Sequence, residues 1–385
     1  MSFSKTETHR EIEDAVGRIC QRFDDAYWLE RDTRAEFPHD FHRAVAKAGW
    51  LGIAMPADYG GAALGITEAA VMMRTVSESG AGMSGASAIH MNIFGLQPVV
   101  VFGTHAQKQR MLPPLIRGED KACFAVTEPD VGLNTTRIKT SAVRKGDRYV
   151  VRGQKIWIST AQVASKMLLL ARTGTPEAGH RGLSLFYTDI DRSKVEIRAI
   201  HKHGRHAVDS NILFFDGLEI PEDDLIGTEG SGFKQLMHGF NPERILLASE
   251  AIGLGHAALR RACQYARERV VFDRPIGQNQ GIQHPLAQSW MNLEAAWLMT
   301  LEAARLYDAG EECGAEANAA KYLAAEAAYA SCQAAVMTHG GMGYSAEYHV
   351  ERYLRECLIP RIAPVSPQMI MNFIGEKVLG LPKSY

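Results

Sequence analysis

The sequence predicts an α+β protein in which an N-terminal helical domain, a central antiparallel β-barrel domain and a C-terminal four-helix bundle follow one another. Helical spacing of apolar residues at the start, short strand-like segments in the middle and long helical segments at the end predict this order. Strands and helices do not alternate, so a doubly wound nucleotide-binding fold is not expected. The predicted domains are residues 1–120, 121–231 and 232–385.

The first predicted domain is helical. Residues 6–30 and 39–50 carry apolar side chains at helical intervals. A glycine-rich break at 56–65 separates these helices from the next helical segment, residues 66–80. Small residues dominate 79–92, which is typical of closely packed backbones and less often of a ligand lying along them.

The second predicted domain consists of strands. Its segments are short, rich in β-branched and aromatic residues, and bounded by Gly, Asp or Pro. They comprise residues 121–128, 148–159, 166–173, 182–190, 195–200 and 211–221. Residues 144–149 supply a hairpin-like turn, so we expect a compact antiparallel sheet or barrel.

The third predicted domain is a four-helix bundle. Residues 241–270 and 315–338 form two long helices, and the second is rich in alanine, the strongest helix former. A further helix has one apolar stripe, and a last helix follows Pro367. The stripe consists of Leu286, Trp290, Leu293, Trp297, Leu301 and Ala304.

Composition excludes several classes of protein. A formal net charge of −2 gives no global attraction to nucleic acid or to an anionic membrane. No apolar run approaches the roughly 18 residues of a membrane span. The N-terminal region alternates acids and bases, so it has no apolar core for a secretory signal, and its Glu and Asp residues argue against a transit peptide. Six cysteines without C-x-x-C spacing predict reduced thiols in a cytoplasmic protein and no metal site. The histidine-rich stretch 201–206 is interpreted as a solvated loop.

Four stretches together carry a resemblance to a known family. They are 123–132 ("CFAVTEPDVG"), 153–160 ("GQKIWIST"), 267–283 and 339–356, the last beginning "HGGMGY". Their order and separation resemble the acyl-CoA dehydrogenases over nearly the whole chain. The resemblance implies that FAD lies between the β-domain and the bundle and oxidises the substrate's Cα–Cβ bond.

The resemblance also assigns cofactor contacts. Trp157 would form a flat wall for the flavin ring and Ser159 a donor near its N5, although a core tryptophan is the simpler interpretation of Trp157 in isolation. Val126 and Thr127 would reach the polar edge of the ring, although an ordinary strand ending at a proline is the simpler interpretation of that stretch in isolation. The family's counterparts of Arg269 and Phe272 contact the cofactor of a neighbouring subunit, which implies a homo-oligomer, a dimer or a tetramer. The full predicted set is Phe124, Val126, Thr127, Gly132, Trp157, Ser159, Arg269, Phe272, Gln280, Gly340 and Gly341. Met337 replaces a frequent glutamine of the family.

The catalytic base is where this sequence departs from many relatives. They carry a Glu in the loop that corresponds to residues 357–369, but Ala363 takes that position here. Glu243 matches the helix position of the base in the isovaleryl-CoA and long-chain branches, and the Ala363 backbone N–H would remain to bind the thioester oxygen. Locally, Asn241 and Pro242 predict a helix start, where an acid also suits the helix dipole.

The resemblance predicts FAD-dependent dehydrogenation of an acyl-CoA thioester to a trans-2-enoyl-CoA, in fatty-acid or branched-chain acyl metabolism. Arg244 would bind near the nucleotide end of coenzyme A, and an electron-transferring flavoprotein would accept the electrons. Leu133 replaces a serine that contacts coenzyme A in relatives, so the acyl carrier stays open. The alternatives are β-elimination, enoyl reduction, or a non-catalytic flavin-binding assembly subunit. A bulky or branched acyl group is a hypothesis that follows from the small Ala363.

Overall fold

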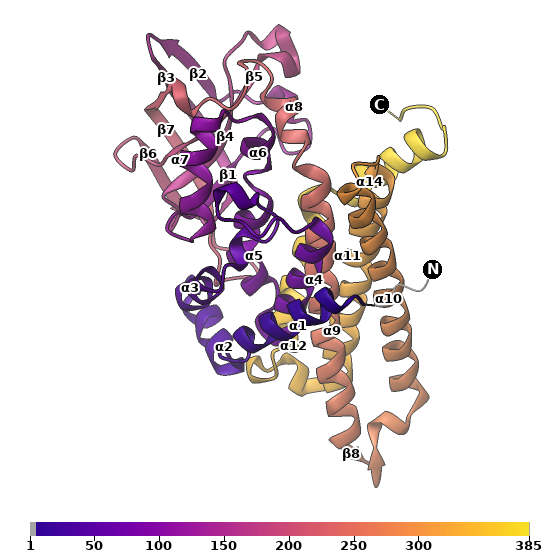
Figure 1. Cartoon of the computed structure of the whole chain (residues 1–385). Coiled ribbons are helices and arrows are strands. Elements are labelled where there is room, and N and C mark those ends of the chain that lie inside the picture. The colour runs from indigo at the N-terminus through magenta and orange to yellow at the C-terminus, as the bar shows by residue number, and fades with distance from the viewer. Residues whose placement is uncertain (1–4, 385) are drawn as a thin grey trace.

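The computed structural model describes residues 5–384, and its order of helices, sheet and helices confirms the predicted architecture (Figure 1). The N-terminal part is built from α1 (Glu7–Cys20), α2 (Asp25–Arg34), α3 (His39–Lys47), α4 (Ile66–Val76), α5 (Gly82–Phe94), α6 (Gln97–Phe102) and α7 (His105–Ile116). The predicted helix over 6–30 is two helices, because the Asp24 side chain accepts the Tyr27 N–H at 2.9 Å and starts α2 anew.

One apolar stretch was overlooked in the sequence. Ile66–Phe102 is long and apolar enough by composition to cross a membrane, but 67% of its apolar window is buried inside the protein. Gly80 and Gly82 have positive φ angles of 110° and 61°, so the chain turns between α4 and α5. The two helices instead pack on the long helix α9 (Phe240–Glu268).

The central sheet has seven strands in the order β1-β4-β2-β3-β7-β6, with β5 paired to β4. They are β1 (Ala122–Ala125), β2 (Ser141–Lys145), β3 (Arg148–Ser159), β4 (Lys166–Arg172), β5 (Leu183–Asp189), β6 (Val195–Ala199) and β7 (Ser210–Pro221). Most pairings are antiparallel, but β1 and β2 both pair with β4 in parallel. β2 was not predicted, because three of its five residues are exposed and it lacks an apolar run.

The C-terminal part packs three long helices, α9, α10 (Gln280–Asp308) and α11 (Gly314–His339), against one another. Shorter helices accompany them: α8 (Gly232–Met237), α12 (Val350–Glu356), α13 (Leu358–Ile362) and α14 (Pro367–Phe373). The predicted last helix is thus only α14, continued by a π-helical turn at Ile374–Val378. Trp290 of the predicted apolar stripe is 55% exposed, so it lies outside the core of this chain.

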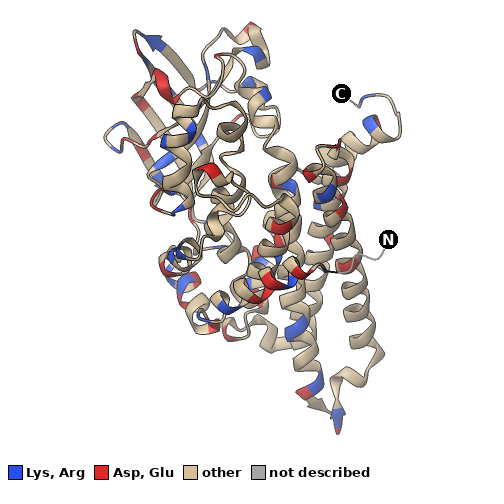
Figure 2. Cartoon of the chain, viewed as in Figure 1, with Lys and Arg blue, Asp and Glu red and all other residues tan. Residues whose placement is uncertain are grey.

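A small hairpin, β8 (Val270–Val271) and β9 (Arg274–Pro275), joins α9 to α10 and projects beyond the long helices (Figure 1). Acidic and basic residues are interspersed along the helices in Figure 2. Many of them form local ion pairs, such as Arg305 with Glu302 at 2.8 Å. This mixing agrees with the small net charge of the sequence.

Candidate active site

A buried ion pair joins the end of β1 to β3. Lys155 is fully buried and donates to Glu128 at 3.0 Å and to the Val126 carbonyl at 2.9 Å. Burial lowers the pKa of Lys155 to about 8, although the Glu128 charge acts against that shift. The Ile156 N–H donates to the Thr127 carbonyl at 2.9 Å. These contacts place the predicted cofactor residues Val126 and Thr127 directly beside the segment that carries Trp157.

A bulge in β3 exposes Trp157. The register with β7 shifts between Lys155 and Ile158, and Trp157 adopts a φ of 62°, which is uncommon outside glycine. Its side chain is 58% exposed, so the indole is available to a ligand or a partner. The expectation of a core tryptophan, which we held as the alternative, does not describe this residue. Phe124 is half-buried on β1, and Gly132 is exposed with open space where a Cβ would stand.

The loop between β6 and β7 holds a residue that sequence reasoning missed. His201 and His203 are exposed as expected, but Arg205 turns inward and donates to the Ser159 hydroxyl at 2.8 Å. Lys202 also turns inward and donates to the Ser210 hydroxyl at 3.1 Å. The interpretation of this stretch as a solvated loop is therefore wrong for its two cations. Local spacing carried no signal, since the partners of Arg205 lie on distant segments.

Glu243 lies in the first turn of α9, and its Oε2 atom is buried without a hydrogen-bond partner. Burial raises the pKa of this carboxyl to about 7, while the charges of His90 and Arg244 act in the opposite direction. The Glu250 charge adds to the rise, and Lys321 opposes it. A half-buried carboxyl that titrates near neutral pH is suited to exchanging a proton with a substrate.

His90 on α5 forms an ion pair with Glu250, which lies two helical turns beyond Glu243 on α9. The distance from His90 Nδ1 to Glu250 Oε1 is 2.5 Å. Burial favours the neutral imidazole, but the charge of Glu250, its hydrogen bond and the charge of Glu243 together outweigh burial, and the pKa of His90 is raised. An imidazolium at this place contributes positive charge next to the Glu243 carboxyl.

The start of α9 differs from the sequence prediction. The helix begins at Phe240 with Gly239 as N-cap, so Asn241 lies inside the first turn and does not cap it. Its amide instead accepts the Arg244 Nη1–H at 3.0 Å and donates to the Cys313 sulfur at 3.4 Å. The preceding helix α8 ends only a few residues earlier, which leaves Asn241 no extended position from which to cap.

Arg244 follows Glu243 and is only partly paired. Its guanidinium lies over the Phe240 ring at 5.7 Å, and its Nε atom is buried without a partner. Burial lowers the pKa of Arg244, and the neighbouring Glu243 opposes that shift. The unused Nε donor leaves this residue able to bind an acceptor on a ligand.

The backbone N–H of Ala363 already has a hydrogen-bond partner within the protein. Its backbone N–H donates to the Ile359 carbonyl at 2.9 Å in the last turn of α13, and Ala363 precedes Pro364 through a cis peptide bond. The described structure therefore does not offer the Ala363 N–H as a free donor for a thioester oxygen, contrary to the expectation. Nearby, Lys321 of α11 donates to the Val365 carbonyl at 2.6 Å and fixes this loop on the bundle.

The remaining predicted cofactor residues lie at the other end of the bundle. At a rise of about 1.5 Å per residue, α9 carries Arg269 about 39 Å away from Glu243. Phe272 at the hairpin tip is 93% exposed, and Gln280 at the start of α10 is exposed as well. Within one chain, these three residues are not brought together with Trp157 and Ser159.

The predicted glycine pair follows α11 directly. Gly340 adopts a φ of 58°, and an added Cβ on Gly340 or Gly341 would meet no atom within 4 Å. Met337, one turn earlier, is 73% exposed. Open space over two glycines allows a ligand to approach the backbone closely.

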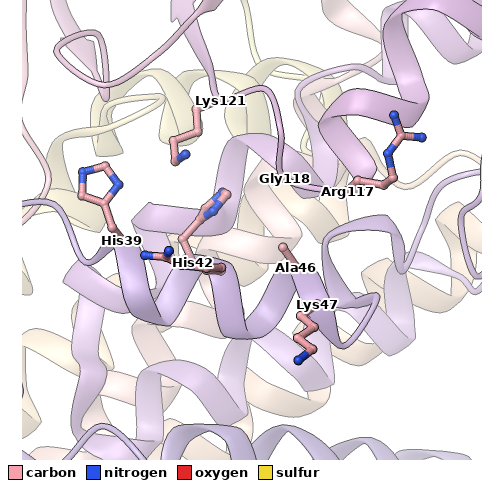
Figure 3. A pocket seen from close by; sticks show the side chains of 8 residues that line it. His39, His42, Ala46, Lys47, Arg117, Gly118 and Lys121 are labelled. Atoms are coloured by element: carbon pink, nitrogen blue, oxygen red, sulfur yellow. The ribbon is translucent and has the colours of Figure 1, made fainter.

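A separate pocket of about 540 Å³ lies between α3 and the segment after α7 (Figure 3). Its lining consists of His39, His42, Arg43, Ala46, Lys47, Arg117, Gly118 and Lys121, none of which belongs to the predicted site. Arg43 pairs with Asp40 at 2.9 Å and Arg117 with Glu119 at 2.7 Å. Acids next to the pocket therefore neutralise two of its basic residues.

Comparison with known proteins agrees with the geometry. The models for the N-terminal, middle and C-terminal domains of acyl-CoA dehydrogenase match residues 6–119, 123–218 and 230–379. Acyl-CoA dehydrogenase FadE12 of Mycobacterium tuberculosis is 36% identical, with 100% of this chain and 99% of that protein covered. A 3-(aryl)acrylate reductase of Clostridium sporogenes is 32% identical, with 97% and 99% covered. The solved structure of butyryl-CoA dehydrogenase from Megasphaera elsdenii has a TM-score of 0.94 at 26% identity, with 98% and 100% covered. The chain therefore belongs to the acyl-CoA dehydrogenase family of flavin-dependent oxidoreductases.

Proposed function

We propose that this protein catalyses the α,β-dehydrogenation of an acyl-CoA thioester with Glu243 as the base. The observation that carries the proposal is the buried, unpaired Oε2 of Glu243 in a carboxyl whose pKa is raised to about 7. At neutral pH a large fraction of this carboxyl is ionised, and because no hydrogen bond holds Oε2, the carboxylate is free to take the α-proton.

The residues proposed for the cofactor fit FAD. Trp157 presents an exposed indole beside the Thr127 backbone, and Ser159 carries a hydroxyl. Gly340 and Gly341 leave open space above their backbone, but they follow His339, which stacks on Tyr265 near the Arg269 end of α9, so in this proposal they serve the cofactor of another copy. A bound flavin would supply the acceptor for the hydride that leaves the β-carbon. This chain's own residues would orient the ring and move the α-proton.

Arg244 is proposed to bind the nucleotide end of coenzyme A. Its buried Nε lacks an acceptor, and a guanidinium binds phosphate oxygens in a fixed planar geometry. Leu133, which replaces a coenzyme A contact of relatives, is 57% exposed and offers no hydrogen bond. Coenzyme A as the acyl carrier therefore stays a prediction, as do a cytoplasmic location and an electron-transferring flavoprotein as the acceptor.

A homo-oligomer, a dimer or a tetramer, is proposed from the separation of the cofactor residues. Arg269, Phe272 and Gln280 lie about one α9 length from Glu243, so in this proposal they serve the cofactor of another copy. The exposed apolar residues Trp290 and Leu298 on α10 support an association surface, since they are 55% and 47% exposed.

Reduction of an enoyl thioester is the second candidate. A carboxyl with a pKa of about 7 is present in both protonation states at neutral pH and can donate a proton as well as accept one. The Clostridium sporogenes relative is named a reductase, which gives this direction a precedent in a protein of similar length. The supply of electrons would then decide the direction of reaction.

The test is anaerobic mixing of the purified holoprotein with a panel of saturated and unsaturated acyl-CoAs while the flavin absorbance is followed. The Glu243→Gln variant should bind flavin and lose at least 100-fold in the bleaching rate, since general-base catalysis contributes about 10²–10⁴-fold. Glu268→Gln, an exposed carboxylate at the far end of the same helix, is the matched control and should bleach normally. Wild-type bleaching by Glu243→Gln would refute the assignment of the base.

Re-oxidation of the pre-reduced holoprotein by an enoyl-CoA, while no saturated acyl-CoA bleaches the oxidised flavin, would favour enoyl reduction over dehydrogenation. Flavin binding without a response to any thioester would favour β-elimination or the assembly role. A preparation that cannot be loaded with FAD would refute the cofactor assignment itself.

A further inference from the structure

Arg205 is a partly buried cation that makes no direct ion pair with a carboxylate among the described residues. Its guanidinium donates to three neutral hydroxyls from three elements: Ser87 on α5 at 3.1 Å, Ser159 on β3 at 2.8 Å and Ser210 on β7 at 3.2 Å. Within residues 5–384, no carboxylate forms an ion pair with it, and its Nε atom is buried without a partner, although the more distant charges of Glu356, Asp209 and Glu250 act on it. Leaving a buried charge uncompensated costs free energy unless another group supplies the opposite charge.

The backbone that carries Arg205 is strained and fixed on both sides. Its φ is 55°, in the left-handed region that L-residues seldom adopt. Before it, a Cβ on Gly204 would stand 2.7 Å from the Cβ of Arg355, so the loop lies tightly against α12. After it, the His206 N–H donates to Asp32 at 3.2 Å, and Arg355 binds the same carboxylate at 2.7 Å. Such over-determined strain is typical of functional positions.

The hydrogen bond from Arg205 also fixes the direction in which the Ser159 hydroxyl points. Ser159 and Ser210 are register partners at the ends of β3 and β7, and one nitrogen of Arg205 donates to both. Because the Ser159 oxygen accepts from a cation, its own proton must point to another acceptor. Hydrogen bonds in such a chain polarise one another, so this hydroxyl is a stronger donor than an isolated serine.

Arg205 belongs to the same charged interior as the proposed base. Its charge acts on His90, the imidazole that also interacts with Glu243. Burial lowers the pKa of Arg205, and the surrounding acids Glu356, Asp209 and Glu250 partly oppose that shift. Asp209 is itself engaged with the Gln162 N–H at 3.1 Å.

We propose that Arg205 is a positioning residue for the flavin, holding the Ser159 hydroxyl as a donor toward the ring and placing a positive charge behind it. The proposal rests on the proposed function only in taking FAD as the cofactor. Two electrons and one proton add one negative charge to the ring system. The positive charge of Arg205 should therefore favour the reduced over the oxidised cofactor.

The test is the midpoint potential of the holoprotein, measured without substrate by anaerobic dithionite titration against a reference dye. Arg205→Met should disfavour the reduced flavin about tenfold, a fall of about 30 mV for a two-electron couple. Arg205→Lys, which keeps the charge, should retain most of the wild-type potential. In a Ser159→Ala background, Arg205→Met should shift the midpoint potential less, since the hydroxyl that Arg205 holds toward the flavin is already removed.

Arg198→Met is the matched control. Arg198 is an exposed arginine on β6 paired with Glu196 at 2.6 Å, so its loss changes the net charge equally without touching Ser159. If Arg205→Met does not hold FAD, Arg205→Gln keeps hydrogen-bond donors but no charge and permits the same comparison.

An unchanged potential in a flavin-loaded Arg205→Met or Arg205→Gln variant would overturn the proposal, and so would an Arg205→Lys shift equal to that of Arg205→Met. Because the titration contains no thioester, neither result bears on Glu243. A wild-type protein that binds no flavin would overturn this proposal and the proposed function together.

Discussion

Glu243→Gln is expected to stabilise the folded protein, and the gain should grow as the pH rises. In the unfolded chain this carboxyl titrates near its ordinary pKa of 4.5, whereas burial raises the folded value to about 7. Below both values the carboxyl is protonated in both states and the raised pKa has no cost. Above them the folded state must hold a half-buried carboxylate whose Oε2 atom has no hydrogen-bond partner, so the wild type loses stability that the neutral glutamine keeps.

The magnitude follows from the two pKa values. The interval from 4.5 to about 7, at about 1.36 kcal/mol per pKa unit, gives an upper value of ~3.4 kcal/mol above about pH 8. The change should develop between about pH 4.5 and pH 7.5 and then level off. An amide without partners also has a cost of about 1–3 kcal/mol, but that cost does not vary with pH and cancels when two pH values are compared.

The assay is the difference in unfolding midpoint between Glu243→Gln and wild type at about pH 5 and about pH 8, with equal flavin loading. Glu268→Gln, at the exposed end of α9, should show no such pH-dependent gain. A gain for Glu243→Gln that is equal at both pH values would refute the reasoning, because it would mean that the folded carboxyl titrates like the unfolded one.

Three further substitutions test other parts of the site. His90→Gln removes the charge that most strongly opposes the raised pKa of Glu243, and it should move the acid limb of the pH–rate profile for flavin bleaching upward by about one unit. An unchanged limb would mean that His90 does not act on Glu243. Lys155→Met leaves the Glu128 carboxylate without its cation and should lower the free energy of unfolding by about 3–5 kcal/mol, measured by denaturant titration. Lys139→Met, at an exposed lysine paired with Asp130, is the control. In Gly341→Leu the added Cβ meets no protein atom, so the thermal stability of the flavin-free protein should stay unchanged while the amount of flavin bound per chain falls. A normal flavin content would argue against a close approach of the cofactor to this glycine.

The sequence determined the architecture because each part of the chain has its own periodicity. Apolar residues at helical spacing predicted α9 and α11 to within a few residues, and β-branched runs predicted six of the seven strands of the main sheet. It did not reveal β2, whose exposed charged residues pair with β3 only because β3 is adjacent. It also did not place Trp290 outside the core, since an apolar stripe does not indicate which part of it a neighbour covers.

The sequence also directed attention to Glu243, through the absence of a carboxylate at Ala363 together with the flavin motifs. Only the tertiary structure decided the chemistry of that residue. The first turn of α9 is polar and ordinary in sequence, but α5 and α11 bury it and bring His90 and Lys321 within range of its charge. Arg205 was hidden for the same reason, because its partners Ser87, Ser159 and Ser210 come from three separate segments. Burial and charge are properties of neighbours in space, so a shifted pKa and a cation held only by hydroxyl groups arise only when the chain is folded.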